Sequence, residues 1–392
     1  MKRILVCLLV LAVSFAVFAS GAKEAAKDEG PIKIGSIMDL SGSGSNMGRP
    51  HSWGVEYAVA QVNANGGING RMLELTTLDC KNDITEGINA YHKLVDEIGV
   101  VAIIGPALSN PASAWVELSA EDKVPIVGHF MDDICTTNPE TGEVYPYMFL
   151  CEPSCAAQSY DIAEYGLKEL GLKSFAVIYN PGNAFAKAHA EPFIKYVEAN
   201  GGTVTDVETI SWTDKDYSAQ ALKIVASKPE AVFLCDYLAQ NLISYDALRD
   251  AGFEGAILGA NTLAPPMADQ VRNTPNDIYF LQNYDMLNQE QGIIYEIIQK
   301  QMAETGTESP QCNVGFGWDA VAVLVDAMRK AKDPTDGEEL AELLAHTDGV
   351  VLSNDATITI DPATHRPSNM GMYIATYDEN KQMVIVGWEQ MY

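Results

Sequence analysis

Residues 32–48 read IKIGSIMDLSGSGSNMG, and this stretch decides how the rest of the chain is interpreted. Its first nine residues form an apolar run typical of a buried strand, and a glycine-rich turn follows. Residues 51–64 then place apolar side chains on one stripe with helical spacing, and a second apolar run follows at 73–80. A strand, a helix and a second strand predict a β-α-β unit at the start of the folded part.

The alternation of strand and helix continues along the chain in two series. The first occupies about residues 31–130 and the second 174–285, with an irregular stretch at 131–173 between them. Strands that alternate with helices predict a parallel sheet with right-handed crossovers. Two series therefore predict an α/β protein of two similarly built lobes, with a single large doubly wound sheet as the alternative. The predicted strands are 32–40, 73–80, 100–106, 124–130, 174–180, 203–210, 231–237, 255–261 and 277–285. The predicted helices are 51–64, 83–98, 110–122, 156–170, 184–199, 218–227, 239–251, 290–305 and 315–331.

The last two predicted helices follow the second series and have no strand series of their own. We expect them to return to the first lobe, so that the chain crosses between the lobes near 150 and 283 and a third time near 350. The expected boundaries are 31–150 and 283–348 for lobe 1, and 151–282 and 349–392 for lobe 2.

Residues 1–22 have the three parts of a secretory signal peptide. Lys2 and Arg3 precede an apolar run at 4–18, and small residues follow at 19–22. The run is shorter than the roughly 20 apolar residues of a spanning helix, although a retained N-terminal anchor is the alternative. No cysteine follows the small residues, so no lipid attachment is predicted. We expect a flexible linker at 23–30 and an unanchored protein in the periplasm.

The charge and the cysteines restrict the partners. The net charge of −28 repels phosphate backbones and anionic lipids, which argues against nucleic acid and membrane surfaces and favours a monomer. Six cysteines follow the predicted signal peptide and permit up to three disulfides in an oxidising compartment. For Cys235, inside an apolar run, we expect a buried free thiol.

The glycine-rich turn at 41–48 invites comparison with a dinucleotide-binding fingerprint. Its spacing departs from that fingerprint, and Asp79 follows some thirty residues on rather than the usual ~20. Without that fingerprint, the turn predicts only a general property, namely that the N-terminus of the helix that follows it can attract an anion. Ser109, after the third strand, could hold a carboxylate or simply cap a helix. No catalytic set and no metal-ligand spacing is present in the sequence, so we expect no catalysis, no cofactor and no metal.

Several segments together resemble one family. IKIGSIMDLSG, QVNANGGINGRMLEL, LDCKND, IIGPALS and VPIVG, followed by VIYNPGNAFAKA, VFLCDY and GFGWDAVAV, resemble periplasmic solute-binding proteins of the branched-chain amino acid type. The glycines in the second of these segments suit a helix that ends in a left-handed turn. The resemblance implies two Rossmann-like lobes, three hinge strands and closure around a solute. It also implies delivery to the permease subunits of an ABC importer in the inner membrane.

The resemblance also implies ligand-binding residues. Ser109, with Leu108 beside it, matches the serine that holds the ligand carboxylate, and Tyr237 matches a tyrosine of the second lobe. Phe185 stands where the family often has tyrosine, and Trp318 stands where an aromatic closes the cleft.

The groups that hold an α-amino group match less well. The family's Ala-Ala-Thr stretch aligns with residues 129–131, and the acid that pairs with the ammonium aligns with Asn261. In this chain a backbone group or one of two nearby aspartates would then have to hold the α-amino group instead. The candidates for this end of the ligand are His129, Phe130, Met131, Asp132, Asp236 and Asn261.

We therefore expect an extracytoplasmic receptor that delivers a small amphiphilic ligand to an ABC importer by cleft closure. Branched-chain or other apolar amino acids come first, and amides, urea-like solutes and aromatic or aliphatic carboxylates are the alternatives. An exported hydrolase and a sensory ligand-binding module are alternatives of other classes.

Overall fold

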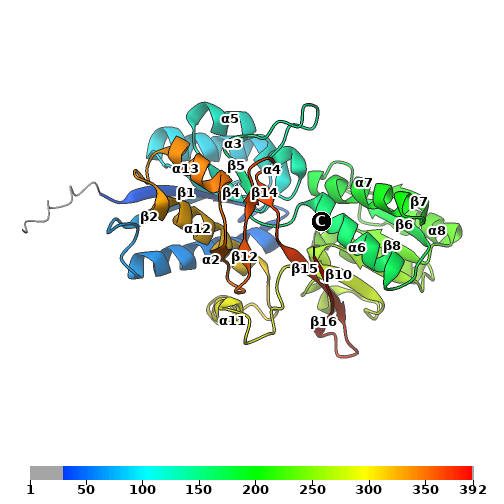
Figure 1. Ribbon diagram of the computed structural model, residues 1–392. Coiled ribbons are helices and arrows are strands. Elements are labelled where there is room, and N and C mark those ends of the chain that lie inside the picture. The colour runs from blue at the N-terminus through cyan, green and yellow to red at the C-terminus, as the bar shows by residue number, and fades with distance from the viewer. Residues whose placement is uncertain (1–29, 391–392) are drawn as a thin grey trace, which may run out of the picture. The chain divides into compact units, whose positions relative to one another are not determined.

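The computed structural model describes residues 30–390, so the predicted signal peptide and all but the last residue of the predicted linker lie outside the described residues. From Ile32 onward the chain forms two main sheets, one of five strands and one of seven (Figure 1). Helices connect successive parallel strands in both sheets, so the predicted α/β architecture with two sheets is confirmed. No helix within residues 30–390 combines the length and the apolar character that crossing a membrane requires.

The first sheet has the strand order β2-β1-β3-β4-β5, and all of its strands are parallel. Each of the four strands predicted for this part of the chain is present. β5 was not predicted, because its apolar run, residues 147–151, is shorter than the seven-residue runs that contain β3 and β4 and lies inside the irregular stretch 131–173. The strands are β1 (Ile32–Met38), β2 (Leu73–Asp79), β3 (Ile103–Ile104), β4 (Ile126–Gly128) and β5 (Met148–Leu150). The helices are α2 (Ser45–Ala64), α3 (Ile84–His92), the π-helix η1 (Lys93–Ile98), α4 (Ser109–Ser113), α5 (Val116–Asp122) and the 3-10 helix η2 (Asp133–Cys135).

The second sheet has the order β16-β15-β10-β9-β8-β6-β7. Its first five strands in the chain are parallel, and the C-terminal hairpin β15-β16 adds two antiparallel strands at one edge. The strands are β6 (Ser174–Tyr179), β7 (Thr203–Thr209), β8 (Ala231–Leu234), β9 (Ala256–Gly259), β10 (Ile278–Gln282), β15 (Gly371–Tyr377) and β16 (Met383–Gln390). The helices are α6 (Cys155–Lys168), α7 (Ala184–Ala199), α8 (Ser218–Ser227), α9 (Leu238–Asp250), the 3-10 helix η3 (Asn261–Leu263) and α10 (Met267–Gln270).

The segment after β10 is shared between the two lobes. Its helices are α11 (Ile294–Thr305), α12 (Asn313–Lys330) and α13 (Gly337–Ala345), and its short strands are β11 (Val350–Val351), β12 (Thr357–Ile358), β13 (Ile360–Asp361) and β14 (Arg366–Pro367). Buried side chains of α13, of β11–β13 and of α12 from Ala320 onward pack in the core of the first sheet, whereas those of α11 and of the first turn of α12 pack with the second-lobe core. The structure therefore departs from the expected boundary at 349. The chain joins the second sheet only at Gly371, because Ile358 and Ile360 are buried against the first lobe.

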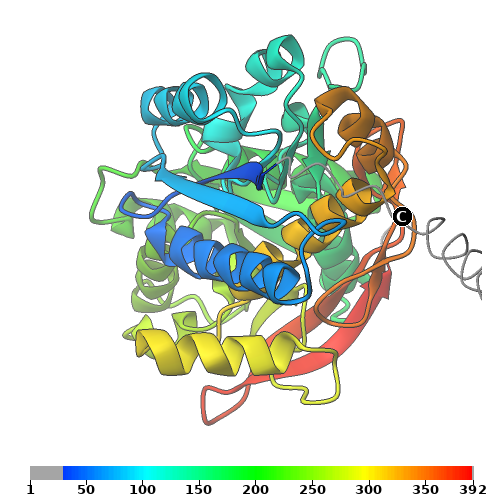
Figure 2. The same ribbon diagram turned by 90° about the vertical axis from the view of Figure 1, so that its left-hand side faces the viewer.

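Two glycines allow α12 to lie directly against α2. A Cβ on Gly54 would come within 2.1 Å of the Val314 carbonyl oxygen, and one on Gly317 within 2.2 Å of the His51 carbonyl oxygen. Figure 2 shows α2 in blue and α12 in orange on the same side of the first sheet. Because both positions lack a side chain, the two backbones touch, and this contact fixes how the start of α12 is placed and rotated against the middle of α2.

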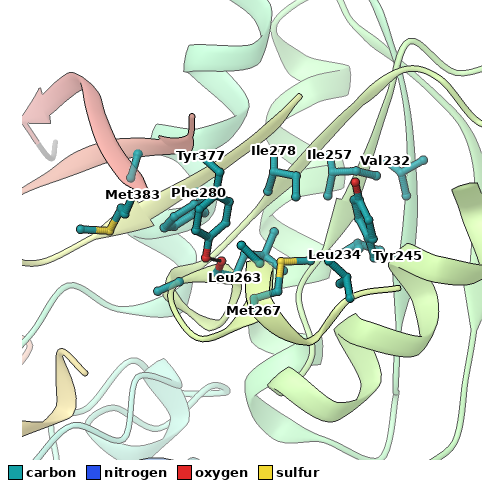
Figure 3. Packing of buried hydrophobic residues seen from close by; sticks show 14 of the residues in the cluster. Val232, Leu234, Tyr245, Ile257, Leu263, Met267, Ile278, Phe280, Tyr377 and Met383 are labelled. Atoms are coloured by element: carbon teal, nitrogen blue, oxygen red, sulfur yellow. Dashed lines mark hydrogen bonds between the residues drawn. The ribbon is translucent and has the colours of Figure 1, made fainter. Parts of the chain in front are cut away.

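Apolar side chains bury both faces of each sheet. One of the second-lobe clusters includes Phe280 and Tyr377 from neighbouring strands, with their rings 5.1 Å apart (Figure 3). The Tyr377 hydroxyl donates a hydrogen bond of 2.7 Å to the Leu263 carbonyl, so the phenol buries its polar end with a partner. A fifth, smaller apolar cluster joins Leu108 and Met131 of the first lobe to Phe185 and Tyr237 of the second. This last cluster lies where the two lobes meet.

Candidate functional site

A cavity of about 50 Å³ lies between the lobes. A single water molecule needs roughly 10–15 Å³ on the same scale, so the space suits a small solute and excludes a macromolecule. Residues of both lobes surround it. They are Asn46, Met47, Ala107, His129, Met131, Glu152, Phe185, Tyr237, Leu238, Asn261, Thr262, Ala264, Pro265, Pro266, Gln311, Cys312, Asn313 and Phe316.

Three of the longer helices begin at this cavity. Asn46 is in the first turn of α2, and Leu238 and Asn313 are the first residues of α9 and α12. The first N–H groups of a helix have no partner inside the helix, and they carry the positive end of its dipole. The cavity therefore offers N–H donors to an anionic group such as a carboxylate.

Five of the eleven predicted site residues line the cavity: His129, Met131, Phe185, Tyr237 and Asn261. The rings of Phe185 and Tyr237 lie 5.5 Å apart, and Tyr237 also stacks on Trp212 at 6.3 Å. The Tyr237 hydroxyl is buried and has no hydrogen-bond partner within residues 30–390. Leu108 contributes to the neighbouring interlobe cluster rather than to the cavity wall.

Ser109 is the first residue of α4, and Leu108 rather than Ser109 occupies the N-cap position. The alternative role of Ser109 as a helix cap is therefore wrong. Its hydroxyl oxygen accepts a hydrogen bond of 3.2 Å from the backbone N–H of Asp132. Ser109 is buried and does not line the cavity, although Ala107, two residues earlier, does.

The two aspartates suggested for an ammonium group are engaged within their own lobes. The Asp132 carboxylate accepts a hydrogen bond of 3.3 Å from the Ile134 N–H, and burial raises the pKa of Asp132 to about 6. The Asp236 carboxylate accepts bonds from Asn183 Nδ2 at 2.8 Å and from the Tyr237 N–H at 2.7 Å, while burial raises its pKa. Neither aspartate belongs to the cavity wall.

Phe130 and Trp318 are not part of the cavity wall either. Phe130 is fully buried in the core of the first lobe. Trp318 lines a separate groove between α2 and α12, and its ring lies 5.9 Å from that of Tyr57. Phe316, two residues earlier, occupies the cavity wall instead, because two residues along a helix rotate a side chain by about 200°. For Trp318, the expectation of an aromatic that closes the cleft is therefore not met by the structure.

A pair of buried histidines adjoins the cavity. The rings of His51 and His129 lie 5.0 Å apart, and His129 stacks on Phe316 at 4.6 Å. Neither imidazole has a hydrogen-bond partner within residues 30–390. Burial lowers the pKa of His51 to about 3 and holds that of His129 well below its usual value, with the neighbouring His51 adding to the effect. Both rings are therefore neutral at pH 7.

Sequence reasoning missed Glu152, the one acidic side chain in the cavity wall. Glu152 is 1% exposed and lies between β5 and α6, where the chain passes from the first lobe to the second. Burial raises its pKa well above the usual value. The sequence did contain one indication of this role, because Glu152 lies beside the crossing between the lobes that is expected near residue 150. Charged residues are common in connecting segments, so this position alone did not distinguish Glu152 from other acids.

The glycine-rich turn that resembles a nucleotide motif binds its own carboxylate. The N–H groups of Gly42 and Gly44 donate to Asp39 at 2.6 and 2.5 Å. A Cβ on Gly48 would lie 1.9 Å from the Asp39 carbonyl oxygen. The glycines therefore allow the turn to wrap around Asp39, and these N–H groups are occupied without a phosphate.

Two α/β lobes with a small cavity between them, lined from both sides, define a solute-binding protein of the two-lobed class. The chain belongs to the periplasmic binding protein family, whose profile matches residues 31–382.

Relatives and solved structures agree with this assignment. The Leu/Ile/Val-binding protein homolog 3 of Brucella melitensis is 28% identical over 257 residues, which are 65% of this chain and 67% of the relative. The chain spans about two thirds of the length of the first curated relatives that it matches. The leucine binding protein LivK of Thermotoga maritima is similar in structure, with a TM-score of 0.80, 23% identity and coverage of 91% of this chain and 98% of that one. LivJ of Streptococcus pneumoniae, solved in complex with isoleucine, is also similar in structure, with a TM-score of 0.79 and 22% identity. The match covers 92% of this chain and 99% of LivJ.

Proposed function

We propose that this protein is an extracytoplasmic receptor that binds an apolar amino acid, with branched-chain amino acids first, and delivers it to an ABC importer. One observation carries the proposal: the cavity between the lobes is of solute size and is lined by Met131 of the first lobe and by Phe185 and Tyr237 of the second. Family membership and the names of the curated relatives support it.

The proposed mechanism uses both lobes in sequence. A solute docks against one lobe, and rotation about the crossing segments then buries it against the other. Closure costs conformational freedom, so contacts from both lobes must offset that cost. The helix starts at Asn46 and Asn313 suit the carboxylate, and the rings of Phe185 and Tyr237 suit the apolar side chain.

Mass spectrometry of solutes released from the purified, gently denatured protein tests the ligand class. We expect an apolar amino acid, and titration calorimetry with leucine, isoleucine and valine should then give saturable binding. Recovery of an amide, a urea-like solute or a carboxylate without an amino group would replace the amino acid by one of the alternatives. Product analysis after long incubation distinguishes a receptor from a hydrolase, because a receptor returns its ligand unchanged.

Small-angle scattering tests cleft closure. The radius of gyration should fall when leucine is added at saturation, and an unchanged radius at proven saturation would contradict the mechanism. We propose further that the protein is periplasmic and monomeric. Cell fractionation should place it in the periplasmic extract, and light scattering should give the mass of one chain.

A further inference from the structure

We propose that Glu152 pairs with a positively charged nitrogen of the bound solute, taking the role that the acid aligned with Asn261 has in the family. The inference rests on the proposed receptor function and specifies the chemistry of its ligand. Glu152 projects from the segment between β5 and α6 into the cavity wall and is 1% exposed.

The hydrogen bonding of this carboxylate is incomplete. Glu152 Oε2 accepts one bond from Asn283 Nδ2 at 3.3 Å, and Oε1 has no partner within residues 30–390. An ionised carboxylate can accept about four hydrogen bonds, and burying it without them is costly. A cationic group in the cavity would supply both the missing donors and the missing charge.

The remaining cavity wall suits a cation at this end. Glu152 is the one ionisable acid among the lining residues, and no lysine or arginine accompanies it there. His129 is neutral, because burial lowers its pKa. The aromatic faces of Phe185, Tyr237 and Phe316 add a further attraction for a positive charge. The helix N-termini offer N–H donors to an anionic group, and Glu152 offers a carboxylate to a cationic group. The cavity therefore suits a ligand that carries both charges, such as an amino acid zwitterion.

Glu152 and its partner Asn283 both lie where the chain crosses between the sheets. β5 of the first sheet ends at Leu150 and α6 begins at Cys155, while β10 of the second sheet ends at Gln282. Segments of this kind absorb the rotation when lobes close. An ammonium group paired with Glu152 in this crossing segment can keep its partner while the lobes rotate. Asn261, by contrast, belongs to the second lobe alone.

Three probes with the same side chain separate the charged groups. Leucine carries both charges, 3-methylbutylamine carries only the ammonium, and 4-methylpentanoate carries only the carboxylate. Titration calorimetry compares the parent with Glu152→Gln and with Glu338→Gln, an exposed acid of α13 that pairs with Lys123. We expect the leucine affinity to fall at least about 30-fold in Glu152→Gln, because a buried charged pair loses one partner, and to stay unchanged in Glu338→Gln. Any binding of 4-methylpentanoate should be unaffected by Glu152→Gln.

Two readouts separate this role from a structural one. The ligand-free Glu152→Gln protein should unfold at the same temperature as the parent or higher, since glutamine can still bond Asn283 and removes a buried acid. Leucine binding to the parent should release protons, seen as a dependence of the heat on the ionisation enthalpy of the buffer. The release follows because burial raises the pKa of Glu152 and an ammonium partner lowers it again. Glu152→Gln should abolish that dependence.

The outcomes are distinguishable. If leucine binds the parent and Glu152→Gln retains its affinity, the role of Glu152 is overturned while the receptor function stands. If only 4-methylpentanoate binds, the receptor function again stands and the cation site is wrong. If none of the three probes binds, the amino acid assignment fails and the inference fails with it.

Discussion

The side-chain oxygen of Asn110 in the first lobe accepts a hydrogen bond of 3.0 Å from the backbone N–H of Ala184 in the second. Asn110 belongs to α4, and Ala184 is the first residue of α7. The first lobe therefore contributes a capping group to a helix of the other lobe, because the first N–H groups of a helix lack partners inside it. The bond joins the two lobes, so in the closure mechanism proposed above it stabilises the closed arrangement.

Replacing Asn110 tests that stabilisation. We expect Asn110→Ala to weaken leucine binding by roughly 2- to 12-fold, the effect of losing one hydrogen bond. The thermal unfolding midpoint of the ligand-free protein should change little, since each lobe keeps its core. Asn110→Asp retains an acceptor and serves as the matched control. Equal calorimetric affinity for the parent and Asn110→Ala would show that the bond does not contribute to closure.

Tyr237 allows the contributions of a ring and a hydroxyl to be separated. Tyr237→Ala should weaken leucine binding by more than tenfold, because it removes a buried aromatic wall of the second lobe. Tyr237→Phe keeps the ring and removes a buried hydroxyl that has no partner within the described residues. If that hydroxyl bonds the ligand, Tyr237→Phe binds leucine more weakly yet unfolds at no lower temperature. Calorimetry and thermal unfolding on both variants provide the comparison, and full affinity in Tyr237→Ala would exclude the second lobe as a contact surface.

Phe316 and Trp318 should differ in their effects on binding. Phe316→Leu removes the ring that stacks on His129 and lines the cavity, so we expect leucine affinity to fall by about fivefold or more. Trp318→Phe alters a groove away from the cavity and should leave the affinity within about twofold. Titration of both variants checks this, and a larger loss in Trp318→Phe would restore the role that the family resemblance implies for it.

The buried histidine of α2 predicts a specific dependence of stability on pH. Burial lowers the pKa of His51 to about 3, whereas a histidine of the unfolded chain has a pKa near 6.5. Between these pKa values the imidazole is protonated in the unfolded state and neutral in the folded state. The contribution of His51 to the free energy of unfolding is therefore complete above pH 6.5 and decreases as the pH falls. We expect the free energy of unfolding of the parent, relative to His51→Gln, to fall by about 1.4 kcal/mol per pH unit between about pH 6 and 4. Urea unfolding at each pH measures this difference, and a difference that is independent of pH would contradict it.

The alternation of apolar runs with helical patterns was sufficient to predict every parallel strand of the two main sheets except β5, and most helices, because each predicted run spans seven or more residues of sequence. β3 and β4 are as short as β5, but they lie inside such runs. β5 and the two-residue strands β11 to β14 give almost no periodic signal of their own, and the helix α13 and the antiparallel hairpin β15-β16 were also not predicted. The cysteines illustrate a different limit: an even number permitted disulfides, but all six described cysteines are buried free thiols. Cys235 was predicted as such, and for the others only the spatial distances between them could decide.

Local patterns and motifs of contiguous residues were enough to predict the α/β class, the two lobes and the family resemblance. Which side chains meet at the cavity depends on how the helices and lobes pack in three dimensions. Phe316 rather than Trp318 faces the cavity, because the contact of Gly54 and Gly317 sets the rotation of α12 against α2. Glu152 enters the cavity wall because two crossing segments, more than 130 residues apart in the chain, lie together there. A binding site formed by residues so distant depends on how the lobes pack, and no local pattern encodes that packing.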